Sequence, residues 1–203
     1  KNFDLGLKWI NKSLVISKND FELLYAKAFT LYQLQNYGDA LHSFDKALEI
    51  EPNHYDSTYY KGKTLFEIGR FNEALEYFQR AILIDDTHAE IFYNAGITFS
   101  KIGKHHDALK NYEKALELVT NYFDALFNTG IILSHLGRFT DAITYFELVL
   151  QNNPDNVEVY HQIGLSNSKI GRFQEALTNY DRAISIKMAH FVSLSSYGKL
   201  LTI

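Results

Sequence analysis

A period of 34 residues constrains this chain more than any other feature of its sequence. The segment EIGRFNEALEYFQRAI at residues 67–82 returns as KIGRFQEALTNYDRAI at residues 169–184, three periods later. Internal self-similarity at such a period is typical of arrays in which one supersecondary unit stacks on the next. Five gapless units follow from residue 21, namely 21–54, 55–88, 89–122, 123–156 and 157–190.

Residue types return at fixed places, counted from the first residue of each unit. Place 8 is small, place 20 is alanine, place 24 is aromatic and place 15 is glycine in four of the five units. These columns hold Ala28, Gly62, Gly96, Gly130 and Gly164; Ala40, Ala74, Ala108, Ala142 and Ala176; Phe44, Phe78, Tyr112, Phe146 and Tyr180; and Gln35, Gly69, Gly103, Gly137 and Gly171. Small residues let two helices approach, and an aromatic side chain fills the space beside them. Glycine at place 15 ends the first helix, because glycine enters the left-handed conformation at little cost. Each unit is therefore predicted to be a helix–turn–helix.

This pattern resembles the tetratricopeptide repeat (TPR), although place 4 lacks the tryptophan often found there and place 32 is proline in only two units, at Pro52 and Pro154. The resemblance implies an all-α fold, a right-handed α-α superhelix (solenoid) of stacked antiparallel helix pairs. The flanks continue the register, so residues 1–20 are expected to be the second helix of a partial repeat and residues 191–203 a terminal or capping helix. The sequence thus predicts about twelve helices in a single TPR solenoid over residues 1–203.

Composition excludes several other classes. The chain has no cysteine and a net charge of -4, with a sequence pI near 6.1. Neither disulfides nor thiolate metal sites can form, and no basic run suggests a nucleic-acid partner. No apolar stretch is long enough to span a membrane, and the N-terminus lacks the layout of a signal peptide. We expect a cytoplasmic protein with neither nucleic acid nor membrane as partner.

No motif for catalysis is apparent, whether a phosphate-binding glycine loop, a nucleophile elbow or HExxH. His54, His88 and His190 all occupy place 34, whole repeats apart, so they are not expected to share a metal ion. We predict a non-enzyme with no cofactor and no metal, although an enzymatic domain could lie outside these residues.

In tetratricopeptide-like arrays, places 2, 5, 6, 9, 12 and 13 of each first helix line a concave groove. Place 5 holds mostly aromatic residues and place 6 mostly carboxamides: Tyr25, Tyr59, Tyr93, Phe127 and His161, then Tyr60, Asn94, Asn128 and Gln162. A carboxamide offers a donor and an acceptor to an extended peptide backbone. The amides resemble the asparagine ladder in the repeats of O-linked N-acetylglucosamine transferase. These nine residues are the predicted peptide-binding residues. Alternatively, the aromatic side chains pack between helices and the amides bond to neighbouring helices.

Place 2 is acidic in all five units, holding Glu22, Asp56, Glu90, Asp124 and Glu158. Carboxylates are favourable at helix N-termini for their own sake. If this column also faces the groove, it favours a ligand that carries lysine or arginine.

These observations predict a non-catalytic protein–protein interaction scaffold that binds an extended peptide or an amphipathic helix. The helix would lie on the N-terminal half of the groove, which is aromatic and holds Tyr25, Phe29, Tyr32, Tyr59, Tyr60 and Phe66. One alternative is self-assembly into homo-oligomers through terminal helices, around Trp9 and Ile10 at one end and Leu194 and Leu201 at the other. Another is the targeting domain of a larger enzyme.

Overall fold

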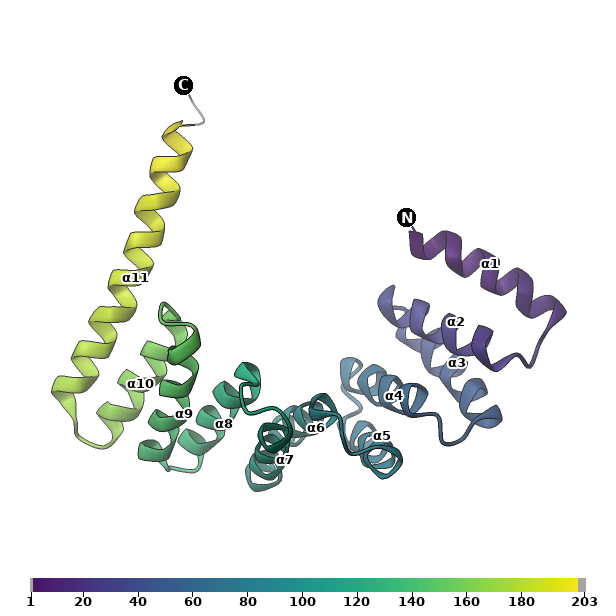
Figure 1. The fold of residues 1–203 in the computed structure, drawn as a ribbon, viewed down its shortest axis with the longest axis horizontal. Coiled ribbons are helices and arrows are strands. Elements are labelled where there is room, and N and C mark those ends of the chain that lie inside the picture. The colour runs from purple at the N-terminus through teal and green to yellow at the C-terminus, as the bar shows by residue number, and fades with distance from the viewer. Residues whose placement is uncertain (1, 201–203) are drawn as a thin grey trace. The chain divides into compact units, whose positions relative to one another are not determined.

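A computed structural model describes the backbone of residues 2–200 and the side chains of residues 5–188. These residues form eleven helices and no strand, which confirms the all-α fold (Figure 1). The helices are α1 (Asn2–Ile16), α2 (Phe21–Gln33), α3 (Tyr37–Ile50), α4 (Tyr55–Glu67), α5 (Phe71–Ile84), α6 (Ala89–Lys101), α7 (His105–Leu118), α8 (Phe123–His135), α9 (Phe139–Asn152), α10 (Val157–Lys169) and α11 (Phe173–Leu200).

The helices fall into two compact units, Lys1–Leu118 with α1 to α7 and Val119–Ile203 with α8 to α11. In the first unit the pairs α2–α3, α4–α5 and α6–α7 pack along the chain, and α1 packs on α2 as the second helix of a preceding repeat would. In the second unit α8 pairs with α9 and α10 with α11, and α9 packs on α10. The predicted helix pairs are thus present in every full repeat.

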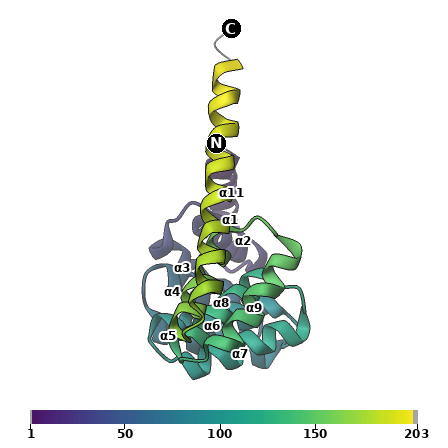
Figure 2. The ribbon, with the colours of Figure 1, turned by 90° about the vertical axis from the view of Figure 1, so that its left-hand side faces the viewer.

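The last helix differs from the prediction. A turn was expected near residue 190, followed by a separate helix at 191–203, but α11 runs unbroken from Phe173 to Leu200 (Figures 1 and 2). The physical reason lies at the junction. Other repeats end in proline, aspartate or asparagine, as at Pro52 and Pro154, whereas the last repeat has no such residue between Lys187 and His190. Without a helix breaker the two predicted helices merge, which accounts for eleven helices rather than about twelve.

The glycine column at place 8 lets each helix pair close. A Cβ atom at Gly62, Gly96, Gly130 or Gly164 would come within 2.5–2.8 Å of the place-24 ring of the same repeat. Real Cβ contacts are essentially never that short, so a methyl group could fit only if the ring moved. The cores of these four repeats therefore rest on a ring packed against a bare backbone, whereas the first repeat has Ala28 at this place.

Place 15 adopts the left-handed conformation in every repeat. The φ angles are +75° to +80° at the four glycines and 58° at Gln35. After this residue the chain closes the helix end, as where the backbone N–H of Arg70 donates to the carbonyl of Leu65 at 2.9 Å. This is the C-terminal capping geometry expected of glycine, and the first repeat reaches it with glutamine.

Candidate peptide-binding surface

The first helix of each repeat lies on the inner side of its unit. In the first unit the backbone of α4 closely approaches those of α2 and α6, whereas within the described residues no such backbone approach joins α3 to α5 or α5 to α7. In the second unit the backbone of α8 likewise approaches that of α10, and no such approach joins α9 to α11 in the part of the chain that the structure describes. Helices that approach one another in alternate positions line the inside of a curved stack. The inner face of each unit is therefore formed by its first helices.

Burial along the first helices follows the repeat register. Places 3, 8 and 10 are buried in nearly all repeats, and place 2 is exposed in all five. Place 6 is half-buried throughout, from Ala26 and Tyr60 to Gln162, and so is place 12. Places 6 and 12 thus form partly exposed rows beside the core, as a binding surface requires.

Tyr60 is the centre of an aromatic cluster on the inner face of the first unit. Its ring centroid lies 4.9 Å from that of Phe29, 5.6 Å from that of Tyr32 and 5.2 Å from that of Tyr59. The rings of Phe29 and Tyr59 meet it edge to face, a geometry that aromatic pairs favour. The cluster thus joins α2 to α4 and leaves Tyr60, Phe29 and Tyr32 partly exposed.

The aromatic side chains at place 5 contact the core as well as the inner face. In four repeats the place-5 ring lies 5.7–6.2 Å from the place-24 ring of its own repeat; the pairs are Tyr59–Phe78, Tyr93–Tyr112, Phe127–Phe146 and His161–Tyr180. Tyr59 is only 4% exposed, while Tyr25, Tyr93 and Phe127 are half-buried and His161 is exposed. Within this set, the buried Tyr59 packs beneath the inner face, and the other four side chains are partly or fully exposed on it.

Burial also perturbs the tyrosine hydroxyls. Desolvation, followed by the nearby Asp56 carboxylate, raises the pKa of Tyr25 to about 12. Desolvation and then the Glu67 carboxylate raise the pKa of Tyr32 to about 12. For Tyr59, burial raises the pKa further, and hydrogen bonding to the Glu90 side chain acts in the same direction. These hydroxyls are therefore neutral donors at physiological pH.

The carboxamides at place 6 make contacts inside the protein. The Asn94 side-chain amide donates to the Tyr59 hydroxyl and to the Glu90 carbonyl, both at 2.8 Å. Gln162 Nε2 donates to a Glu158 carboxylate oxygen at 2.9 Å. Asn94 lies in the first unit, and Asn128 and Gln162 lie in the second. The donors of Asn94 and Gln162 are thus engaged with neighbouring groups, whereas their carbonyl oxygens accept none of these bonds.

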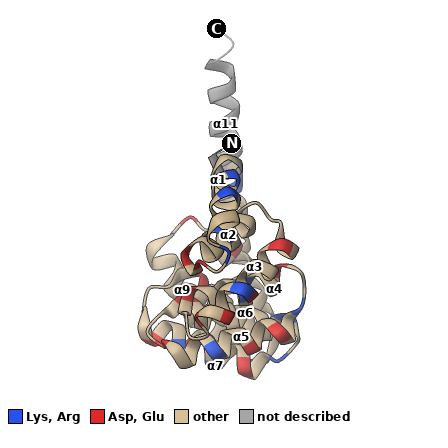
Figure 3. Cartoon of the chain, turned by 90° about the vertical axis from the view of Figure 1, so that its right-hand side faces the viewer, with Lys and Arg blue, Asp and Glu red and all other residues tan. Residues whose placement is uncertain are grey.

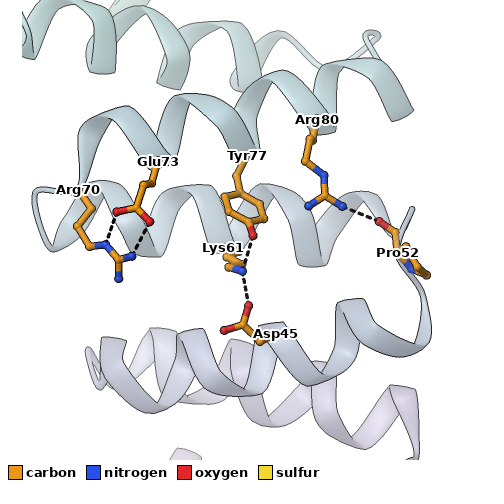
Figure 4. A network of polar contacts seen from close by, with 7 residues as sticks. All are labelled: Asp45, Pro52, Lys61, Arg70, Glu73, Tyr77 and Arg80. Carbon is orange, nitrogen blue, oxygen red and sulfur yellow. Dashed lines mark hydrogen bonds and ion pairs between the residues drawn. The ribbon is translucent and has the colours of Figure 1, made fainter.

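No pattern in the sequence indicated a buried lysine away from this surface. Lys61, on α4, is 8% exposed; its ammonium group donates to Asp45 of α3 and, at 2.6 Å, to the Tyr77 hydroxyl of α5 (Figure 4). The ammonium also lies 4.1 Å from the centroid of the Tyr77 ring. The ammonium is thus paired with one carboxylate and hydrogen-bonded to one hydroxyl, as a buried charge requires. This contact set joins consecutive repeats and is a structural feature.

Over residues 5–188, the distribution of charged and metal-ligating side chains indicates no further kind of site. In the view of Figure 3, acidic and basic positions are interspersed over the helices of the first unit. Among the side chains that the structure describes, no group of three His, Cys, Asp or Glu residues is placed to hold a metal ion. None of the described helices is both long and apolar enough to cross a membrane.

Stacked helix pairs that repeat in one register define a helical-repeat protein. Family models described as tetratricopeptide repeat match residues 21–54, 55–121, 93–157 and 157–190. The chain belongs to the tetratricopeptide repeat family, as the sequence pattern predicted.

Solved structures agree on the fold. The chain is 24% identical to MamA, with a TM-score of 0.79 over 83% of this chain and 92% of that one. It is also 24% identical to YrrB, described as a TPR protein with an unusual peptide-binding site, with a TM-score of 0.79 over 93% of this chain and 97% of that one. The C-terminal part of a TPR repeat-containing protein from Cytophaga hutchinsonii is 19% identical, with a TM-score of 0.84 over 93% and 76% of the two chains. No curated protein sequence matches the chain. The comparisons indicate no catalytic family, and the chain has the fold of a protein–protein interaction scaffold.

Proposed function

We propose that the chain binds an extended segment of a partner protein along the inner faces of its first helices. In the first unit the segment lies against the aromatic cluster on α2 and α4 and reaches Tyr93 and Asn94 on α6. In the second unit Phe127, Asn128, His161 and Gln162 offer ring and amide contacts on α8 and α10. Tyrosine suits this role because it combines a large apolar face with a polar tip.

The observation that carries this proposal is a group of neighbouring aromatic side chains on the inner face that remain partly exposed. Phe29, Tyr32 and Tyr60 lie together on the inner face, and none of them is buried. Contiguous exposed apolar surface is uncommon on monomeric proteins and marks interaction sites. YrrB, which shares the fold, has a peptide-binding site by its description, which supports the same use of the repeat.

A peptide selection tests the proposal. A random-peptide phage library is panned against the chain, and enriched peptides are measured by fluorescence anisotropy against the wild type and an Asn94→Ala/Asn128→Ala double variant. The matched control is Asn111→Ala/Asn179→Ala, whose amides donate only to carbonyls of their own helices. The proposal predicts enrichment and weaker binding by the first variant alone. Failure to enrich any peptide contradicts the proposed function. Equal binding by both variants contradicts a role for the place-6 amides in holding the peptide backbone.

The contact of Asn94 with Tyr59 affects how this test is run. Loss of the hydrogen bond should cost about 1 kcal/mol of the free energy of unfolding. Binding is therefore measured well below the melting temperature, with circular dichroism to show that each variant is folded.

Self-association is a second candidate, favoured by exposed apolar side chains on the first and last helices. Trp9 on α1 is 68% exposed, and Phe173, Leu177 and Met188 are exposed on α11. Leu194 and Leu201 lie outside the described side chains. Sedimentation velocity across a concentration series, with Trp9→Ser for comparison, tests this candidate; a monomer at all concentrations rejects it.

A further inference from the structure

A small pocket opens between the first turns of α4 and α6 in the first unit. It has a volume of about 240 Å³ and is lined by Tyr55, Asp56, Tyr59, Tyr60, His88, Ala89 and Glu90. Three of its walls are tyrosine rings: those of Tyr55 and Tyr59 are nearly parallel at 5.9 Å, and that of Tyr60 meets Tyr59 at 5.2 Å. Asp56 and Glu90 are exposed at its rim. The pocket therefore combines aromatic faces with two carboxylates.

The chain's own Lys63 shows which chemistry this site attracts. Its ammonium nitrogen lies 3.3 Å from a Glu90 carboxylate oxygen. It also lies 5.4 Å from the ring centroid of Tyr59 and 5.7 Å from that of Tyr60. Both distances are within the range in which a cation is attracted to a ring face. An internal ammonium group thus already contacts one carboxylate and two rings of the pocket.

The electrostatic environment of the tyrosines points the same way. After desolvation, the carboxylates of Glu90 and Asp56 are the next largest causes that raise the pKa of Tyr60. The same two carboxylates act on Tyr55 beside that of Asp85, also in the raising direction. Burial is the largest cause of the raised pKa for both tyrosines, and the added effect of the carboxylates shows that their negative charge reaches the pocket, where it favours a cation.

We infer that this pocket binds a cationic side chain, arginine or lysine, of the partner segment, with the cation against Tyr55 and Tyr60 and paired with Asp56 and Glu90. The inference rests on the proposed function and names the partner chemistry that this part of the inner face selects. Arginine is the better fit, because its planar guanidinium stacks on aromatic rings and pairs with carboxylates through two donors. The Lys63 ammonium competes with the partner's cation for Glu90 and the Tyr60 ring, so Lys63 weakens binding of the partner.

An anionic ligand is the opposite possibility, because α4 and α6 both begin at this pocket. A helix N-terminus carries about half a positive charge in its unpaired N–H groups. Two full carboxylates at the rim exceed these partial charges, and the Lys63 ammonium that pairs with Glu90 is the cation that a partner side chain replaces there. The pocket is therefore suited to a cation despite its place in the fold.

The test uses peptides enriched in the selection above. Each arginine is replaced in turn by citrulline, which keeps the shape and removes the charge, and each lysine by norleucine. Binding is measured against the wild type, Asp56→Asn/Glu90→Gln and Lys63→Met. The matched control is Glu49→Gln/Glu76→Gln, which removes two exposed carboxylates from α3 and α5.

The inference predicts a basic residue in the enriched peptides. It also predicts about tenfold weaker binding by Asp56→Asn/Glu90→Gln, because each substitution removes one ion pair between the pocket and the peptide cation. Lys63→Met should bind about two- to fivefold more tightly. The citrulline or norleucine peptide should lose affinity for the wild type and no longer distinguish the variants. Enriched peptides without a basic residue, or equal binding by the pocket and control variants, would overturn the inference and leave the proposed function intact. No enrichment at all would overturn both.

Discussion

The α-carbon of Gly96 lies so close to the ring of Tyr112 that a Cβ atom at position 96 would come 2.6 Å from two ring carbons. Tyr112 is among the largest fully buried side chains, so its ring has little room to move. We predict that Gly96→Ala lowers the free energy of unfolding by about 1–3 kcal/mol, the usual cost of overpacking. Urea unfolding followed by circular dichroism measures the change.

Gly38 provides the matched control for that substitution. It lies in α3, and a Cβ atom there would have no neighbour within 4 Å. Gly38→Ala should raise the free energy of unfolding by about 0.5–1 kcal/mol, because alanine is the better helix former. If both substitutions change stability alike, the packing explanation for place 8 is wrong.

Gln35 adopts the left-handed conformation that glycine adopts in the other four repeats, with φ 58°. A side chain in this conformation costs about 1–2 kcal/mol, and glycine does not pay it. Gln35→Gly should therefore stabilise the chain by about 1 kcal/mol, and Gly69→Ala should destabilise it by a similar amount. Thermal unfolding of the two variants checks the opposite signs, and a shift in the same direction for both would refute the argument.

The pairing of Lys61 with Asp45 predicts an asymmetry between its two partners. Asp45→Ala leaves the ammonium of Lys61 buried with only Tyr77 as a partner, so the free energy of unfolding should fall by about 1–3 kcal/mol. Lys61→Met removes the buried charge and keeps the volume, so it should change stability by less than about 1 kcal/mol. A double-mutant cycle measures the coupling, and a larger loss for Lys61→Met than for Asp45→Ala would contradict this assignment.

The raised pKa values of Tyr25 and Tyr32 predict a loss of stability at alkaline pH. The pKa values of Tyr25 and Tyr32 are raised to about 12 in the folded chain, above the ordinary value of 10.0. As pH rises past 10.0, the unfolded chain releases these protons while the folded chain keeps them, so stability falls until the folded pKa is passed. The contribution is fully present below pH 10.0.

A Tyr25→Phe/Tyr32→Phe variant isolates this contribution from other alkaline titrations. Its free energy of unfolding should fall less steeply than that of the wild type between pH 10.0 and about 12. Ultraviolet titration should show two fewer late-ionising tyrosines. Identical pH profiles for the two proteins would refute the raised values.

Much of the fold could be predicted because the repeat register encodes it locally. Small residues at places 8 and 20 let the two helices approach, glycine at place 15 ends the first helix, and the aromatic residue at place 24 fills the space between the helices. Each of these residue types can be recognised from the sequence alone. The continuous α11 could have been anticipated from the missing helix breaker between Lys187 and His190. The repeat register predicted a turn there, but no proline, aspartate or asparagine is present to end the helix.

The site was less accessible to sequence reasoning. The place-5 column was correctly seen as aromatic, but the contact of Tyr59 with Phe78 depends on how α4 meets α5. Tyr55 and His88, which line the small pocket, were not among the predicted binding residues. A signal was present, since an aromatic residue at place 1 and a histidine at place 34 recur in the first two repeats, at Phe21 with His54 and Tyr55 with His88. Asp45, Lys61 and Tyr77 lie on three different helices, and nothing local connects them.

The measurement that tests the central claim most directly is a crystal structure of the chain with a peptide enriched in the selection. The account predicts peptide density over the inner face of the first unit, in contact with Tyr60 and crossing from α2 toward α6. Density on the outer helices α3, α5 or α7, with the Tyr60 ring uncovered, would contradict it.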